Sequence, residues 1–276
     1  MKLENKIAVV TGAGGVLCSG FAEALSHEGA TVILLDINEE SIKNVCEKIK
    51  AQGGKADYFK CSVLDKKSLE SVHNSILEKH GKCNILINGA GGNSPRCTLA
   101  NEYFEIGDET REDVKTFFNL DSEDFGFVFD LNLMGTLIPT QVFAPDMVEN
   151  DGVIINISSM NAFRPLTKIP AYSGAKSAVS NFTMWLSVYL ASAKIRVNAI
   201  APGFFVTKQN QSLLFDESGK PTKRTEKILN ATPMKRFGKP EELYGTLLWL
   251  CDNEASGFVT GIVVPVDGGF SAYSGV

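Results

Sequence analysis

A tyrosine and a lysine one helical turn apart are the residues of this sequence best suited to proton transfer. Tyr172 and Lys176 are spaced Tyr-x-x-x-Lys, so a helix would place both side chains on the same face. A nearby ammonium group favours the phenolate and lowers the pKa of a tyrosine. A tyrosine that releases or returns a proton near neutral pH is a general acid or base. The pair alone is a weak signal, because a partly buried tyrosine beside a solvated lysine is common on helices.

Two polar residues upstream extend the pair to a candidate catalytic set. Ser159 ends an apolar run thirteen positions before Tyr172, and Asn132 precedes both. A serine hydroxyl can hydrogen bond a substrate oxygen and fix its position. Without Tyr172 downstream, Ser159 would be better explained as a strand-end hydroxyl that satisfies loop amides.

The composition is that of a globular protein with a sizeable core. The chain has 276 residues, 44% hydrophobic and 21% charged, and its net charge of -5 gives no sign of nucleic-acid binding. The six cysteines and three histidines show no metal-ligand spacing, so we expect reduced thiols, no metal and a cytoplasmic location. We also expect no signal peptide, no stretch long enough to cross a bilayer and no membrane partner.

Short apolar runs alternate with helical patterns along the chain. Most of the runs are near-continuously apolar and β-branched, as buried parallel strands are. The predicted strands are Ile7–Thr11, Thr31–Asp36, Ala56–Cys61, Asn84–Asn88, Val153–Ser158, Arg196–Ala201 and Ile262–Val266. The predicted helices lie near 17–29, 39–52, 66–80, 123–149, 171–193 and 240–252. This alternation predicts a single α/β domain, a Rossmann-type doubly wound parallel sheet of about seven strands with helices on both faces.

Two long polar connections interrupt the alternation. They are residues 92–121, with only a short helix expected inside, and residues 203–239. Long loops in compact domains are usually functional or mobile. Both connections should leave the carboxyl ends of strands, where open α/β sheets bind ligands.

The first strand and the second end in residues that suit a dinucleotide. Thr11-Gly12-Ala13-Gly14-Gly15 opens a helix, and glycines there let backbone amides approach a pyrophosphate. Asp36 ends the second strand, where a carboxylate hydrogen bonds ribose hydroxyls and repels a 2′-phosphate. No Arg or Lys flanks Asp36, so NAD(H) is preferred over NADP(H). A plain glycine-rich turn, and an aspartate that starts a turn before Asn38, remain the simpler alternatives.

Taken together, these features resemble the short-chain dehydrogenase/reductase family over nearly the whole chain. The catalytic residues implied by the resemblance are Asn132, Ser159, Tyr172 and Lys176. The other matching motifs are Thr11-Gly12, Asn88-Gly89-Ala90-Gly91, Pro202-Gly203 followed by Thr207, and Val266-Asp267-Gly268-Gly269. The implied cofactor-binding positions are Gly12, Gly14, Gly15, Val16, Leu17, Asp36, Ser62, Val63, Asn88, Gly89, Ala90, Tyr172, Lys176, Pro202, Gly203, Phe205 and Thr207.

The resemblance implies a role for each catalytic residue. In oxidation Tyr172 takes the hydroxyl proton as a hydride leaves for the nicotinamide, and in reduction it returns the proton. Lys176 lowers the tyrosine pKa and binds the nicotinamide ribose, while Ser159 positions the substrate oxygen. Asn132 holds a water that links Lys176 to solvent, and Thr207 holds the nicotinamide carboxamide.

The sequence departs from the family pattern at four places. Val16 and Cys18 stand where the family has glycines, and Gly89 replaces the second asparagine of its motif. Ser62 stands where an acidic residue is usual, although Val63 fits, and the 92–121 connection is longer than usual. These changes bear on cofactor affinity rather than on reaction type.

The substrate is indicated by polar and basic residues in the connections. The candidates are Asn93, Arg96, Arg164, Lys168 and Lys208, with Gln209 beside them. An arginine can hold a carboxylate with two hydrogen bonds, so a small anionic polyol fits, although each of these residues could equally be a solvated surface side chain.

A closer resemblance concerns one branch of the family. Thr11–Ser19, Gly91–Arg96 and Ser256–Val276 resemble the D-mannonate oxidoreductase (fructuronate reductase) branch. This implies NAD-linked interconversion of D-mannonate and D-fructuronate.

Two alternatives remain open. Another reductase of the family would act on a gluconate-type sugar acid or a 3-oxoacyl thioester, although acyl reductases commonly use NADPH, which Asp36 disfavours. A protein of a different class would be a non-catalytic NAD-binding redox sensor, which could lose the tyrosine or the lysine.

The resemblance also implies a homotetramer. The predicted helices at 123–149 and 171–193 carry apolar residues on more than one face, and such a helix usually buries a second face. The family packs these two helices across one interface and its C-terminal strand region across another.

Overall fold

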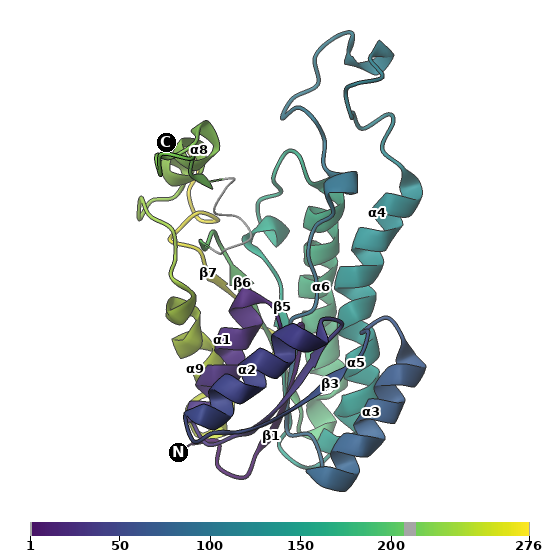
Figure 1. The fold of residues 1–276 in the computed structure, drawn as a ribbon, viewed down its shortest axis with the longest axis vertical. Helices are drawn as coiled ribbons and strands as arrows, with labels where there is room; N and C mark the ends of the chain where they lie inside the picture. Colours follow the sequence, from purple (N-terminus) through teal and green to yellow (C-terminus); the bar gives the residue numbers. More distant parts are fainter. Residues whose placement is uncertain (1, 207–213, 276) are drawn as a thin grey trace.

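Residues 2–206 and 214–275 are described in the computed structural model of this chain (Figure 1). They form one sheet in the order β3-β2-β1-β4-β5-β6-β7, with every neighbouring pair parallel. The strands are β1 (Ile7–Thr11), β2 (Thr31–Asp36), β3 (Lys55–Lys60), β4 (Ile85–Asn88), β5 (Val153–Ile157), β6 (Arg196–Pro202) and β7 (Val263–Val266). The strand order reverses between β1 and β4, as in doubly wound sheets, so the predicted fold class is confirmed.

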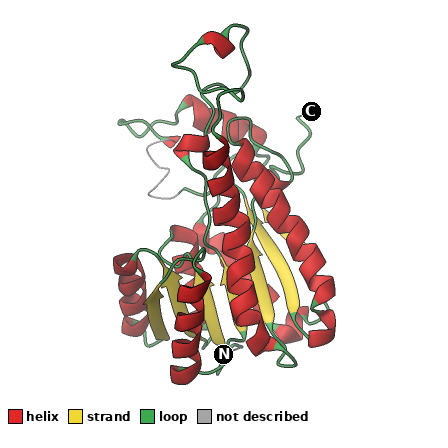
Figure 2. Cartoon of the chain, turned by 90° about the vertical axis from the view of Figure 1, so that its right-hand side faces the viewer, coloured by secondary structure: helices red, strands yellow, loops and turns green. Residues whose placement is uncertain are grey.

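Helices cover both faces of the sheet (Figures 1 and 2). Alternate residues of each strand face opposite layers, so Val10 packs with one set of helices and Val9 with the other. The Val10 face carries α1 (Val16–His27), α2 (Glu39–Ala51) and α9 (Tyr244–Cys251). The Val9 face carries α3 (Lys66–Lys79), α5 (Gly135–Phe143) and α6 (Pro170–Tyr189).

The strands could be predicted from the sequence because helices cover both faces of the sheet, so the central strands are near-continuously apolar. β1, β4, β5 and β6 are buried along their whole length, and the observed strand ends lie within one residue of the predicted ones. The described residues also form two short helices: α8 (Lys223–Ala231), inside the 203–239 connection where we predicted none, and α10 (Asn253–Ser256).

The predicted helix at 123–149 is wrong as a single α-helix. It consists of α4 (Ser122–Phe129), a π-helical turn η3 (Asp130–Met134), α5 and a 3₁₀ turn η4 (Ala144–Met147). Asn132 Nδ2 donates to the Val128 carbonyl oxygen at 2.7 Å, so a side chain enters the backbone hydrogen-bond ladder. Such an insertion widens or bends a helix.

The same helical stretch corrects a second expectation. By length and hydropathy alone, Ser122–Met147 could cross a membrane, contrary to the prediction that no stretch is long enough. Half of its most apolar window is buried inside the protein, as in a core helix that packs on a sheet.

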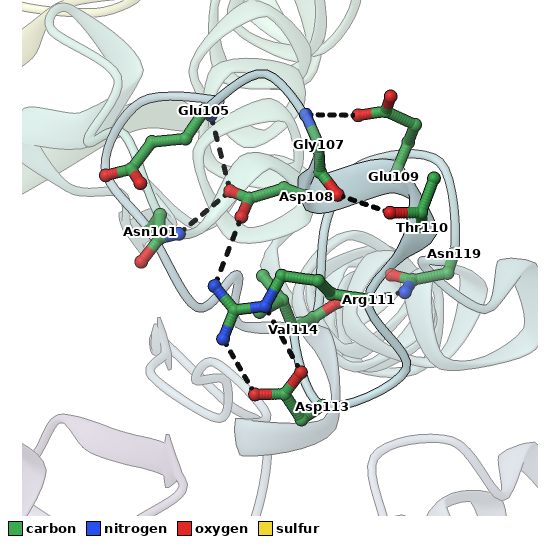
Figure 3. A network of polar contacts seen from close by, with 10 residues as sticks. All are labelled: Asn101, Glu105, Gly107, Asp108, Glu109, Thr110, Arg111, Asp113, Val114 and Asn119. Carbon is green, nitrogen blue, oxygen red and sulfur yellow. Dashed lines mark hydrogen bonds and ion pairs between the residues drawn. The ribbon is translucent and has the colours of Figure 1, made fainter.

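The 92–121 connection projects from the body at the top of Figure 1 and folds on its own polar network (Figure 3). It contains two 3₁₀ turns, η1 (Pro95–Cys97) and η2 (Asp108–Thr110). The buried Asp108 carboxylate accepts from Asn101 Nδ2 at 2.9 Å and from the Glu105 N–H at 3.3 Å. Arg111 lies 3.7 Å from the same carboxylate. The tip stands away from the sheet, so only the base of this insertion can border a ligand.

Candidate active site

The fold gathers the four predicted catalytic residues at the carboxyl end of β5. Ser159 follows this strand at the start of a 3₁₀ turn η5 (Met160–Ala162), while Tyr172 and Lys176 lie on the first turns of α6. Lys176 Nζ lies 5.6 Å from the Tyr172 ring centroid and donates to the Ile157 carbonyl oxygen at 2.7 Å. Ser159 hydrogen bonds Tyr172.

Asn132 belongs to this cluster but is already fully engaged. Its Nδ2 donates to the carbonyl oxygens of Gly92 at 2.8 Å and Val128 at 2.7 Å, and its Oδ1 accepts the Gly92 N–H at 3.1 Å. The side chain therefore clamps the turn after β4 onto the π-helical segment. The expectation that Asn132 holds a water stays untested. The side-chain amide already makes the three hydrogen bonds given above, so it is not the group that would bind this water.

The electrostatics of the site differ from the expected direction for Tyr172. Burial raises the pKa of this phenol, and the hydrogen bond from Ser159 opposes the shift. Burial also lowers the pKa of Lys176 to about 8. Both side chains share one desolvated site, which disfavours the charged form of each. The predicted lowering by Lys176 is not seen in this structure, where burial is the largest cause of the Tyr172 pKa shift.

The two loops after β1 and β4 pack backbone against backbone. Thr11 Oγ1 accepts the N–H groups of Gly89 at 3.1 Å and Ala90 at 3.2 Å. Gly12 has a φ of 65°, and a Cβ there would lie 2.8 Å from the Ala90 Cα. A glycine is therefore required at this turn for both its conformation and its close approach.

The neighbouring groups fit an adenine dinucleotide. Gly15 is the N-cap residue of α1 and has no side chain that could accept a hydrogen bond from the helix. The N–H groups of Val16 and Leu17 are therefore available to bind an anion such as a pyrophosphate. The Asp36 carboxylate ends β2, accepts the Gly14 N–H at 3.0 Å and keeps lone pairs for ribose hydroxyls. The turn, the helix end and the carboxylate thus lie together at one edge of the sheet, and their role in holding a cofactor stays a prediction.

The remaining predicted cofactor positions lie along the same edge, with different roles. Ser62 and Val63 follow β3. Asn88 donates to Thr140 Oγ1 and Asn156 Oδ1, both at 2.9 Å, so its side chain fastens β4 to its neighbours. These contacts show that Asn88 shapes the edge from within the core.

After β6, Gly203 is held against the closing strand. Its N–H donates to the Val266 carbonyl oxygen at 2.9 Å, and a Cβ on it would lie 2.5 Å from Asp267 Cα. Pro202 ends β6 and Phe205 is buried nearby. Thr207, Lys208 and Gln209 lie outside the described residues.

The four predicted substrate residues within the described part of the chain do not meet in one contact. Arg164 Nε donates to the Ser271 carbonyl oxygen at 3.2 Å, and the Lys168 carbonyl oxygen accepts from Leu99 at 2.9 Å. The Arg96 guanidinium, mostly exposed, lies 3.3 Å from Asp124. Asn93 Nδ2 donates to Thr98 Oγ1 at 2.9 Å.

One polar residue of the site was not singled out from the sequence. Asn161 is 4% exposed, its N–H donates to Ser159 Oγ at 3.2 Å, and its Oδ1 has no hydrogen-bond partner among the described residues. A buried amide with an unmet group beside a candidate catalytic serine is worth testing with the substrate residues. The sequence feature that could have identified Asn161 is its position two residues after Ser159.

A hydroxyl, a phenol and an ammonium beside a dinucleotide cradle define an NAD(P)-dependent oxidoreductase of alcohols and ketones. The chain belongs to the short-chain dehydrogenase family, whose model, described as short chain dehydrogenase, matches residues 6–218.

Similar proteins cover the whole chain. An uncharacterized oxidoreductase of Haemophilus influenzae is 57% identical over 275 residues, 99% of this chain and 96% of that protein. The uncharacterized oxidoreductase UxuB of Bacillus subtilis is 50% identical over 275 residues, 99% of this chain and 98% of its own. A crystal structure from Haemophilus influenzae of a proposed D-mannonate oxidoreductase with bound NAD has a TM-score of 0.96 and 56% identity. It covers 100% of this chain and 98% of that one.

Proposed function

We propose that this protein is an NAD-dependent oxidoreductase that interconverts D-mannonate and D-fructuronate. The observation that carries the proposal is the cluster of Ser159, Tyr172 and Lys176 at the carboxyl end of β5, on the same edge of the sheet as Gly14 and Asp36. The similar structure with bound NAD supports the cofactor, and its proposed activity supports the substrate.

The roles proposed for these residues follow from their chemistry. A bound nicotinamide supplies or accepts the hydride. Ser159 holds the substrate oxygen, and Tyr172 removes its proton in oxidation or returns it in reduction. Lys176 hydrogen bonds the nicotinamide ribose and, when charged, favours the phenolate form of Tyr172. Gly12, Val16, Leu17 and Asp36 hold the adenosine and pyrophosphate part.

A substrate panel tests the proposal directly. NADH oxidation should be measured with fructuronate, keto-gluconates, a 3-oxoacyl thioester and uncharged ketones. Turnover of fructuronate above the others supports the substrate, whereas activity on thioesters alone favours the acyl reductase alternative. NADH binding without turnover of any substrate favours the non-catalytic redox sensor.

Arg164→Ala should raise KM for fructuronate by roughly 10- to 100-fold, because a charge-assisted bond to a carboxylate is lost. Arg164 is the better of the two arginine candidates, since Arg96 already has Asp124 as a partner. Steady-state kinetics check this, with Lys43→Ala, a cation on α2, as the matched control. An unchanged KM in Arg164→Ala would remove this residue from the substrate site.

Cofactor binding should weaken as the pH rises through about 8, the value to which burial lowers the pKa of Lys176. Only the protonated lysine presents a charge to the ribose, so affinity is highest below that pKa and falls above it. Well above it, the Kd for NADH should level off at a higher value, because the neutral amine still donates a hydrogen bond to the ribose but carries no charge. Fluorescence titrations of NADH across this range measure the effect. Tyr172→Phe should keep the same pH dependence, and a flat profile in the wild type contradicts the role of Lys176.

A homotetramer in the cytoplasm is part of the proposal. Met184, Trp185, Val188 and Tyr189 form an exposed apolar face on α6, each between 47% and 78% exposed. Large exposed apolar faces mark interaction surfaces. Light scattering at micromolar concentration should give the mass of four chains, and a stable monomer would refute this assembly.

A further inference from the structure

Two departures from the family pattern meet at one point of the structure. A Cβ on Gly89 would lie 2.1 Å from Cys18 Sγ and 2.9 Å from the Thr11 carbonyl oxygen. Gly89 is not among the residues with a positive φ, so its backbone conformation does not require glycine. The Cys18 sulfur occupies the space that a side chain at residue 89 would need, and the Thr11 carbonyl oxygen borders the same space.

The contact lies between the two loops that form the dinucleotide cradle. Cys18 is in the first turn of α1, and its side chain is only 5% exposed. Gly89 follows β4 and is tied through its N–H to Thr11 Oγ1. The sulfur thus lies under the turn whose next residues approach Gly12 and the catalytic cluster.

The turn that contains Gly89 also packs closely against Asn132 and Lys176. A Cβ on Gly91 would lie 2.6 Å from Asn132 Oδ1 and 3.2 Å from Lys176 Nζ. A shift of the turn at Gly89 would therefore be felt at Asn132 and Lys176. Burial raises the pKa of Cys18 to about 12, so the group is a neutral thiol that acts through its size rather than as a nucleophile.

We propose that Cys18 is a positioning residue for the cofactor. Its sulfur sets the spacing between the loop at 11–18 and the loop at 88–92, and Gly89 is its steric complement. The identity of the cofactor as NAD rests on the proposed function, whereas the steric coupling of the two residues does not.

The distances between Cys18 and Gly89 suggest a compensating pair of substitutions. Gly89→Ala should weaken NADH binding by about tenfold or more, because an added methyl group in a packed site displaces its neighbours. In Cys18→Ala/Gly89→Ala the added methyl group faces the Cβ of residue 18 across 3.6 Å, an ordinary contact, and its remaining close neighbour is the Thr11 carbonyl oxygen at 2.9 Å. The double variant should regain most of the NADH affinity that Gly89→Ala loses, since the worst clash is removed and total side-chain volume is nearly conserved, while a small shift of the turn away from Thr11 remains.

Two single substitutions serve as controls. Gly126→Ala adds a methyl group on α4, where a Cβ would have no neighbour within 4 Å. Cys46→Ala removes a buried thiol from α2, away from both loops. Neither control should change the Kd for NADH by more than about twofold.

The experiment measures the Kd for NADH by fluorescence and the Tm by thermal unfolding for the wild type and all four variants. Rescue of Gly89→Ala by Cys18→Ala in the Kd supports the proposal. The proposal is overturned if Gly89→Ala binds NADH like the wild type, or if the double variant is no better. A lower Tm with unchanged Kd overturns it too, because the contact would then be merely structural.

Two further outcomes remain decisive. If Gly89→Ala does not fold, recovery of folded, NADH-binding protein in the double variant supports the coupling, and failure to recover overturns it. If the wild type itself does not bind NADH, the proposed function fails, while rescue of the Tm still reports whether Cys18 and Gly89 are coupled.

Discussion

Tyr172→Phe should lower kcat by at least about a hundredfold, the usual contribution of a positioned acid or base. The change removes only the hydroxyl that exchanges a proton with the substrate and keeps the ring that packs beside α4. Ser159 would still position the substrate oxygen, but no group at that place could take or return its proton. The Kd for NADH should stay within about twofold, since the ring and Lys176 are retained.

Steady-state kinetics and NADH titration separate these two effects. Tyr189→Phe is the matched control, because this tyrosine lies on the same helix with 68% of its surface exposed. Near wild-type turnover in Tyr172→Phe would refute the catalytic assignment. Loss of NADH binding together with turnover would instead point to a structural role for the hydroxyl.

The sequence predicted the catalytic cluster because its members depend on simple geometry. Tyr172 and Lys176 share a helix face at any tertiary arrangement, and Ser159 ends a strand whose apolar residues mark it clearly. Parallel strands bring their carboxyl ends to one edge, so residues after β1, β2, β4 and β5 had to converge there. The resemblance to a family then supplied roles that geometry alone leaves open.

Other features were hidden because they depend on contacts between distant segments. The π-helical turn at Asn132 exists because its amide reaches both Val128 and Gly92, and the second contact crosses forty positions. The burial that shifts the pKa of Lys176 is likewise a property of the packed site. No periodicity in the sequence reports either one.

The insertion at 92–121 shows the same limit for a loop. Its length marked it as functional, but its shape comes from Asp108, a buried carboxylate held by Asn101 and Arg111. A polar residue at the centre of a loop network looks like any solvated residue in the sequence. The structure shows this insertion as a projecting element whose shape the sequence did not reveal (Figure 1).

Cofactor choice gives the second large expected effect. Asp36 stands at the end of β2 with its carboxylate fixed by the N–H groups of Gly14 at 3.0 Å and Asn38 at 2.9 Å. A 2′-phosphate placed on the adenosine ribose would lie beside this charge, and like charges brought together at a binding site cost several kcal/mol. The wild type should therefore prefer NAD(H), and Asp36→Ala should narrow the ratio of kcat/KM for NAD to that for NADP by about a hundredfold.

Asp36→Asn removes the charge while keeping one acceptor oxygen of the side chain. That oxygen can still accept the Gly14 N–H, although the acceptor for the Asn38 N–H is lost, so most of the narrowing should already appear in this variant. If Asp36→Asn keeps the wild-type ratio while Asp36→Ala loses it, discrimination comes from hydrogen bonding to the ribose. A clear preference of the wild type for NADPH, measured as kcat/KM for both cofactors, would exclude the role of Asp36 altogether. Charge repulsion also predicts a dependence on salt concentration. The penalty on NADP should weaken as salt screens the carboxylate, whereas discrimination by a hydrogen bond to the ribose would not change with salt.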